Sequence, residues 1–196
     1  MTLKEFFTLC GLLLTLVAFV PYLRDILRNR IRPHVFSWVI WGLTTFVTFL
    51  AQLSAGAGPG AWPIGLSGLL TIAVAVLAYI KRADLRITRL DWVFFLAALS
   101  ALPLWFFTAD PTTAVIVLTA VDMLGFGPTF RKVWQQPHTE SIPFYLLFLV
   151  RSLLVVLAVS EFSVATVLFP AAVALACTLV IVLILLRRRC TPPPTA

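Results

Sequence analysis

The sequence is poor in charged residues. Asp, Glu, Lys and Arg make up 12% of its 196 residues, whereas apolar residues make up 61%, and the mean hydropathy is +1.02. Soluble domains average about 25% charged and about 45–50% apolar residues. A chain of this length cannot bury so much apolar surface in one globular core, so its solvent must be lipid. The composition predicts an integral membrane protein, which we expect in a bacterial cytoplasmic membrane.

Side chains that carry chemistry are also scarce. The two histidines, His34 and His138, fall in expected loops. The three cysteines are Cys10, Cys177 and Cys190. Their spacing is not that of a metal site, and their different expected depths in the membrane argue against a disulfide. We expect no cofactor, and because no nucleophile–base pair or carboxylate cluster is evident, the sequence does not predict an enzyme.

The net charge of +7 does not indicate a nucleic-acid-binding protein. The basic residues lie at the ends of apolar stretches, where signals for membrane orientation are found. Seven such stretches are long enough to cross roughly 30 Å of hydrocarbon at about 1.5 Å per residue. Because unpaired backbone groups are costly in lipid, we expect helices and not open strands. The expected helices are 5–27, 35–54, 61–80, 92–109, 112–132, 141–160 and 165–186.

The basic residues alternate between the two expected membrane faces. Thirteen of the fifteen Lys and Arg lie in the loops after the first, third and fifth helices and in the C-terminal tail. Lys4 lies at the opposite face and Arg151 within a helix. The positive-inside rule then places the N-terminus outside and the C-terminus in the cytoplasm. An even number of helices would break this pattern, so it supports seven.

Two parts of the chain repeat one another. In each, a proline (Pro21 or Pro128) precedes an arginine by three residues, and a P-H-x-x-S motif follows at 33–37 or 137–141. The motif's serine precedes the basic end of the repeat by 44 residues in the first copy and 46 in the second. Three helices therefore repeat, and one linker helix between them makes the repeats parallel. The expected divisions are a first repeat at 1–82, a linker helix at 83–110, a second repeat at 111–187 and a cytoplasmic tail at 188–196.

This pattern of a proline, a basic loop and a serine at the next helix start, repeated in a 3+1+3 arrangement, resembles the PQ-loop superfamily over residues 8–186. That superfamily includes SWEET and SemiSWEET sugar transporters and cystinosin-like amino-acid exporters. The resemblance implies alternating-access transport of a small polar solute (a sugar, an amino acid or an organic acid), with Pro21 and Pro128 as hinges. Asp122 is a separate candidate for coupling transport to protons. The glutamine expected after each proline is replaced by Tyr22 and Thr129, so its role does not carry over. The alternative is a receptor or scaffold of the same fold.

Asp122 and Arg151 are the candidate site. Both are expected roughly 13 Å from the cytoplasmic end of their helices, at about 1.5 Å per residue. An ion in the membrane costs several kcal/mol unless it is paired or hydrated, so a functional site is the default hypothesis. Arg151 suits a carboxylate or phosphate, and Asp122 suits a proton or a cationic group. The alternative is a mutual salt bridge that only joins two helices.

Four further residues are candidates for lining a cavity. Trp38 and Trp41 lie three residues apart on one helix face, although tryptophan at this depth is also typical of interfacial anchors. Gln52 offers hydrogen bonds to a solute or to another helix. Thr15 occupies the first-repeat position that corresponds to Asp122. The expected partners are the solute, protons and the lipid bilayer, and a second copy of the chain is a candidate.

Overall fold

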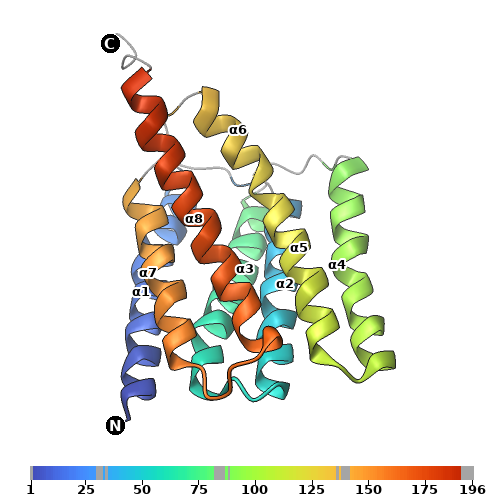
Figure 1. Ribbon diagram of the computed structural model, residues 1–196. Helices are drawn as coiled ribbons and strands as arrows, with labels where there is room; N and C mark the ends of the chain where they lie inside the picture. The colour runs from blue at the N-terminus through green and yellow to red at the C-terminus, as the bar shows by residue number, and fades with distance from the viewer. Residues whose placement is uncertain are drawn as a thin grey trace.

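The computed structural model describes residues 2–29, 33, 35–81, 87, 89–135, 137 and 142–190. Over this part of the chain the structure is helical and contains no strand (Figure 1), which confirms the all-α class. The elements in order are α1 (Leu3–Leu27), α2 (Val35–Ser54), the 3-10 helix η1 (Gly58–Ala61), α3 (Trp62–Ile80), α4 (Arg89–Thr108), α5 (Pro111–Gly125), α6 (Gly127–Gln135), α7 (Ile142–Ala158) and α8 (Val164–Cys190).

The described helices differ in whether they are long enough to cross a membrane. Four segments are both long and apolar enough: Leu3–Leu27, Val35–Ser54, Gly58–Ile80 and Val164–Cys190. Three further apolar helices are shorter, namely Phe95–Thr108, Pro111–Gly125 and Ile142–Ala158. On the long helices α1, α3 and α8, large apolar side chains such as Leu13, Val76 and Leu175 are at least half exposed. The structure is thus consistent with an integral membrane protein, with four helices that meet the length criterion where the sequence predicted seven spans.

Local sequence explains where the helices begin. Thr2 caps α1, since its hydroxyl accepts from the Glu5 backbone N–H at 3.2 Å while the Glu5 carboxylate accepts from the Thr2 N–H at 2.7 Å. This reciprocal pair is a capping box. Asp110 caps α5 by accepting from the Thr112 N–H at 2.9 Å, directly before Pro111 in the first turn. Both caps satisfy backbone donors that have no partner inside the helix.

The predicted helix at 112–132 is wrong as one continuous helix. The structure ends α5 at Gly125 and begins α6 at Gly127, with a turn at Phe126. Glycine costs a helix interior about 1 kcal/mol relative to alanine, and Pro128 has no N–H to donate to the carbonyl of Leu124. At the turn itself, the Phe126 N–H donates to the Met123 carbonyl, three residues earlier in the chain, at 3.1 Å. Two glycines and a proline within four residues thus divide this helix, whereas the lone Pro21 leaves α1 unbroken to Leu27.

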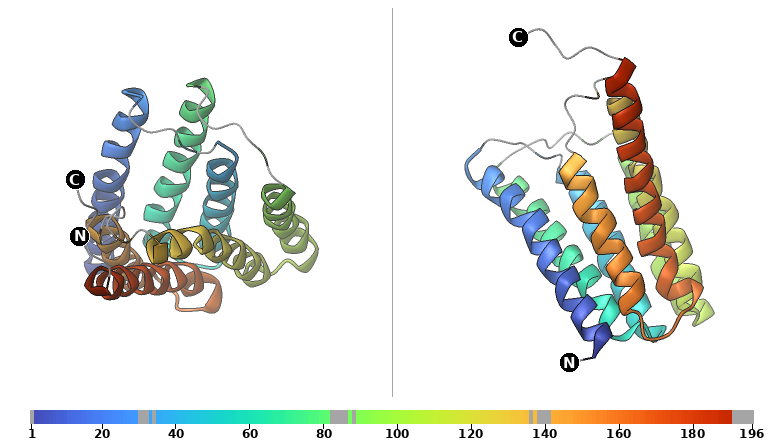
Figure 2. Two further views of the ribbon diagram at one scale, coloured as in Figure 1. Left: turned by 90° about the horizontal axis from the view of Figure 1, so that it is seen from above. Right: turned by 60° about the vertical axis from the view of Figure 1, so that its left-hand side comes forward.

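The helices pack as two groups that close on one another. In the first group α1 and α2 both pack on α3, and in the second α5 and α7 both pack on α8. The groups meet where α1 packs on α7 and where α2 packs on α5. Seen from above (Figure 2, left), α4 lies at the edge of the bundle, beside α5 and α2. The space between the groups is therefore bordered by both of them and not by α4.

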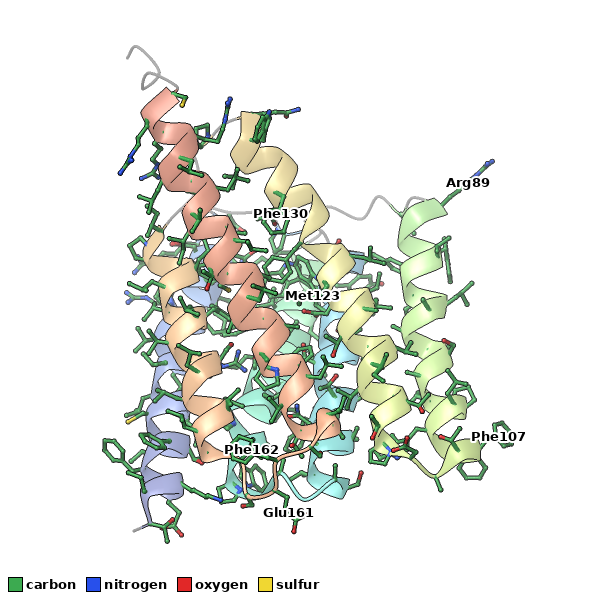
Figure 3. The ribbon with its side chains drawn as sticks, viewed as in Figure 1. Arg89, Phe107, Met123, Phe130, Glu161 and Phe162 are labelled. Carbon is green, nitrogen blue, oxygen red and sulfur yellow. The ribbon has the colours of Figure 1, made fainter. Side chains whose placement is uncertain are left out.

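The two ends of the bundle differ in chemistry. The basic end carries Lys81, Arg89 and Arg187–Arg189, and the C-terminal end of α8 lies there. The other end carries the N-terminus (Figure 1) together with Glu161 and Phe162 (Figure 3). Several residues of the predicted loops lie outside the described part of the chain: Arg30, Arg32, His34, Arg82, Arg86, His138 and Ser141.

The loops at the N-terminal end bond across the two helix groups. The Ser160 N–H donates to the Ala57 carbonyl at 2.9 Å, and the Glu161 N–H donates to the Gly56 carbonyl at 3.3 Å. A Cβ at Gly60 would lie 2.7 Å from the backbone nitrogen of Val159, so glycine allows the two backbones to touch. We call these contacts the N-terminal closure.

Candidate functional site

A cavity of about 260 Å³ lies between the two helix groups. It receives side chains from every α-helix of the two groups. The lining residues are Ala18, Phe19 and Tyr22 of α1; Trp38, Trp41 and Thr45 of α2; Ser67 and Thr71 of α3; Asp122 and Gly125 of α5; Phe126 and Thr129 at the α5–α6 junction; Phe144, Tyr145, Phe148 and Arg151 of α7; and Phe169, Val173 and Cys177 of α8. Pockets for drug-sized ligands are about 300–1,000 Å³, so this cavity suits a smaller solute.

Asp122 reaches the cavity from the last turn of α5. Its side chain is 8% exposed, because α2 and α8 both pack against α5. The Thr44 hydroxyl lies 3.4 Å from the Asp122 Oδ1 and 3.0 Å from the Trp41 carbonyl. One hydroxyl hydrogen cannot serve both acceptors fully, and 3.4 Å is long for a hydrogen bond between oxygens. The carboxylate therefore retains most of its capacity to accept hydrogen bonds.

Arg151 reaches the same cavity from α7. Its side chain is 4% exposed, its Nη2 donates to the Pro63 carbonyl at 3.1 Å, and its buried Nε has no acceptor among the residues that the structure describes. The guanidinium carbon lies 5.5 Å from the centroid of the Phe148 ring, within the range of a cation–π contact. The contacts with Phe148 and Pro63 fix the position of the guanidinium. They use few of its five N–H donors.

No ion pair joins Asp122 and Arg151. The carboxylate accepts from Thr44 on α2, and the guanidinium donates to Pro63 on α3. The two charges are nonetheless close enough to interact electrostatically. The mutual salt bridge that the sequence left open is thus not formed, and two opposite charges share one cavity without neutralising each other directly.

Aromatic rings form the wall at α1 and α2. Both candidate tryptophans line the cavity. The Trp38 ring lies 5.0 Å from the Tyr22 ring and 5.7 Å from the Trp41 ring, and it meets the Phe19 ring edge-on at 6.5 Å. These separations are within the range of favourable aromatic pairs. The tryptophans therefore pack around the cavity and not only at the membrane interface.

The other two candidate lining residues lie outside the lining of the cavity. Gln52 is 1% exposed and its Nε2 donates to the Thr166 carbonyl at 3.1 Å, which ties the end of α2 to the start of α8. The Thr15 hydroxyl donates to the Gly11 carbonyl of its own helix at 2.8 Å. Both side chains thus use their polar groups in helix contacts, as buried polar groups in membrane helices commonly do.

The two candidate hinge prolines lie where their helices border the cavity. Pro21 precedes the lining residue Tyr22 within α1, and Pro128 lies in the first turn of α6. The lining residues Phe126 and Thr129 flank Pro128 in the chain. A change of backbone angle at either position would therefore alter the shape of the cavity.

Sequence reasoning missed several lining residues, among them Ser67, Thr71 and Phe148. Ser67 and Thr71 lie four apart, on one face of an otherwise apolar helix, and this spacing is a signal that they point the same way. Phe148 precedes Arg151 by three residues and so lies on the same face of α7. Such spacing identifies a shared face but not which neighbour covers it.

No protein-family model, curated protein or solved structure matches the chain. Within the described residues, no group of three or more His, Cys, Asp and Glu side chains is placed to hold a metal ion. The function must therefore be argued from the cavity itself.

Proposed function

We propose that this protein is a membrane transporter of a small polar solute. The solute binds between the two helix groups, and these open the cavity to each side of the membrane in turn. One observation carries the proposal: the buried side chains of Asp122 and Arg151 line one cavity between the helix groups and are not paired with each other. A buried charge without a direct partner costs several kcal/mol. A solute that pairs with both groups compensates that cost, whereas a purely structural role would favour a salt bridge or apolar side chains.

The pattern of helix contacts supports a 3+1+3 arrangement like that of the PQ-loop superfamily. If α1, α2 and α3 correspond to α5–α6, α7 and α8, then the contact of α1 with α7 corresponds to the contact of α2 with α5. A two-fold axis along the membrane normal would exchange these two contacts. The repeat around Pro21 and Pro128 gives the same correspondence, with α4 as the linker.

The N-terminal closure supports alternating access. Backbone hydrogen bonds from Ser160 to Ala57 and from Glu161 to Gly56 join the two bundles at that end. The positive-inside rule assigns the basic end to the cytoplasm. We therefore propose that the structure is closed to the outside and that transport requires these bonds to break, with Pro21 and Pro128 as hinges.

Access of a charged reagent to the cavity tests the proposal. Ser67 is changed to Cys in a full-length chain that carries Cys10→Ser, Cys177→Ser and Cys190→Ser, and the protein is placed in vesicles with one orientation. A charged methanethiosulfonate reagent that cannot cross lipid is then added to either side. We expect labelling from both sides, because the cavity opens to each in turn.

The matched control is Thr48→Cys in the same background. Thr48 is fully buried on α2 and lies outside the lining of the cavity, so this variant should stay unlabelled. Labelling of Ser67→Cys from one side only would overturn alternating access and favour the alternative, a receptor or scaffold of the same fold.

A further inference from the structure

We infer that the cavity binds a zwitterionic amino acid with an aromatic or large apolar side chain. Its carboxylate pairs with Arg151, its ammonium group pairs with Asp122, and its side chain lies among the aromatic rings. The inference rests on the proposed function in one respect, that the solute occupies this cavity. It adds the chemical class of the solute.

Asp122 and Arg151 together favour a solute that carries both a positive and a negative charge. The Arg151 guanidinium has one hydrogen-bond acceptor among the described residues, the Pro63 carbonyl, and its planar array of N–H groups matches a carboxylate. Within the described part of the chain, Asp122 accepts one long hydrogen bond, from Thr44. A purely anionic solute would leave the Asp122 charge without a partner, and a purely cationic solute would leave Arg151 without one. A zwitterion provides a partner for each.

The remaining lining suits a ring or a large apolar group. Most of it consists of aromatic side chains, including Phe19, Trp38 and Phe169. Rings of this kind gain free energy from offset or edge-on contact with another ring. Because side chains from both bundles contribute rings, an aromatic solute would contact the two bundles at once.

A sugar fits this lining less well. Every hydroxyl group of a buried sugar needs a hydrogen-bond partner, and each one left without a partner weakens binding. The neutral hydroxyl side chains of the lining outside the aromatic residues are Thr45, Ser67, Thr71 and Thr129. The Thr71 hydroxyl already donates to the Ser67 carbonyl at 2.7 Å. A neutral sugar would also leave both Asp122 and Arg151 without an opposite charge.

Three related probes separate the possible ligand chemistries. Binding to the purified full-length protein is measured by calorimetry for L-phenylalanine, for 3-phenylpropionate, which lacks the ammonium group, and for 2-phenylethylamine, which lacks the carboxylate. Glucose is the fourth probe. We expect L-phenylalanine to bind about tenfold or more tightly than each of the others, the ratio that one charged hydrogen bond supplies.

Two variants assign each charge to its residue. In Arg151→Gln, L-phenylalanine should lose its advantage over 2-phenylethylamine. In Asp122→Asn, it should lose its advantage over 3-phenylpropionate. Ser54→Ala is the control, because Ser54 lies outside the lining and its hydroxyl donates to the Ala51 carbonyl of its own helix at 2.8 Å. Its affinities should equal those of the wild type.

Other outcomes overturn the inference. Equal binding of L-phenylalanine and 3-phenylpropionate by the wild type would indicate a site for a simple carboxylate, and equal binding of 2-phenylethylamine would indicate a site for a cation. Tighter binding of glucose, or no binding of any probe, would overturn the amino-acid class. The labelling of Ser67→Cys tests transport independently of these binding measurements. A failure of the amino-acid inference is therefore distinguishable from a failure of the proposed function.

Discussion

Gly125 lies directly against the indole ring of Trp41. A Cβ at Gly125 would meet the Trp41 Nε1 at 2.6 Å. Trp41 belongs to α2 in the first helix group, and Gly125 ends α5 in the second, so this contact joins the groups at the wall of the cavity. Both residues line the cavity, and Gly125 is the last residue of α5 before the break. A change of backbone angle at the break would therefore move the Trp41 ring and alter the shape of the cavity.

We predict that Gly125→Ala lowers the free energy of unfolding by about 1–3 kcal/mol, the usual cost of overpacking. The Cβ must displace the indole, since no side chain fits at 2.6 Å. Thermal unfolding in detergent measures the loss. Combining Gly125→Ala with Trp41→Phe, which removes Nε1, should recover part of it. Equal midpoints for Gly125→Ala and the wild type would contradict the contact.

Gly60→Ala should weaken the N-terminal closure. The added Cβ would lie 2.7 Å from the Val159 backbone nitrogen, and backbone at this distance cannot move aside as a flexible side chain can. We expect a reagent on the N-terminal side to label Ser67→Cys several-fold faster in this variant. The matched control is Gly65→Ala, whose Cβ would meet the Phe49 ring at 2.8 Å within the first helix group. Faster labelling in both variants would indicate general loosening instead.

Gln52→Leu should destabilise the protein without affecting binding. The Gln52 Nε2 donates to the Thr166 carbonyl at 3.1 Å in a fully buried contact between α2 and α8. Removing the donor should cost about 1–3 kcal/mol, because the carbonyl is left without it. Thermal unfolding measures this loss. The affinity for L-phenylalanine should stay within about twofold of the wild type, and a larger change would place Gln52 in the binding site.

Arg151→Met should abolish binding without destabilising the protein, the opposite of what we expect for Gln52→Leu. A buried charge without a direct partner costs several kcal/mol. Among the described residues no carboxylate pairs directly with Arg151, so an apolar side chain of similar length removes that cost. We expect a free energy of unfolding within about 1 kcal/mol of the wild type or higher, together with a loss of L-phenylalanine binding. A loss of stability as large as that of Gln52→Leu would show that Arg151 is a structural residue.

Asp110 should make the stability of the protein depend on pH at acidic values. The Thr112 backbone N–H donates to its carboxylate and is the main reason that the pKa of Asp110 is lower in the folded protein. The carboxylate therefore stabilises the fold above the unfolded pKa of about 3.9, and this contribution is lost as the pH falls through the lower, folded pKa.

The comparison with Asp110→Asn isolates this effect. Asparagine caps a helix about as well as aspartate and does not titrate in this range. Between about pH 5 and pH 2, the unfolding midpoint of the wild type should therefore fall further than that of Asp110→Asn. Other carboxylates are common to both proteins and cancel. Parallel midpoints at every pH would contradict the capping role of the charged form.

Helix positions were the most predictable part of the structure. The expected helix at 35–54 coincides with α2, Val35–Ser54, and the one expected at 61–80 differs from α3 by one residue. Long apolar runs between polar loops determine these limits locally. The sequence predicted a hinge at Pro128 but a continuous helix at 112–132, because the chain is not clearly polar until Arg131. Glycine and proline weaken a helix there, but the packing of Trp41 against Gly125 also depends on a residue distant in the sequence.

The candidate site was predictable in part. Asp122 and Arg151 stand out in sequence because they are charged residues within apolar runs, and their distance along each helix predicts a similar depth. Their partners were not predictable. Thr44 and Pro63 belong to other helices, and the direction in which a side chain points around the helix axis follows from which neighbour packs on that face. For the same reason the sequence left open whether Gln52 bonds to a solute or to another helix, and in the structure it bonds to α8.

The sequence by itself determined that the chain is helical, that its surroundings are apolar, and that two opposite charges lie within the helices. Composition and hydrophobic runs are local properties, and lipid accepts few backbone conformations. Only the tertiary structure decided that Asp122 and Arg151 share one aromatic cavity without pairing, and that the N-terminal end is closed by backbone bonds between the two helix groups. These features depend on contacts among helices far apart in the chain, where small differences in packing select one partner over another.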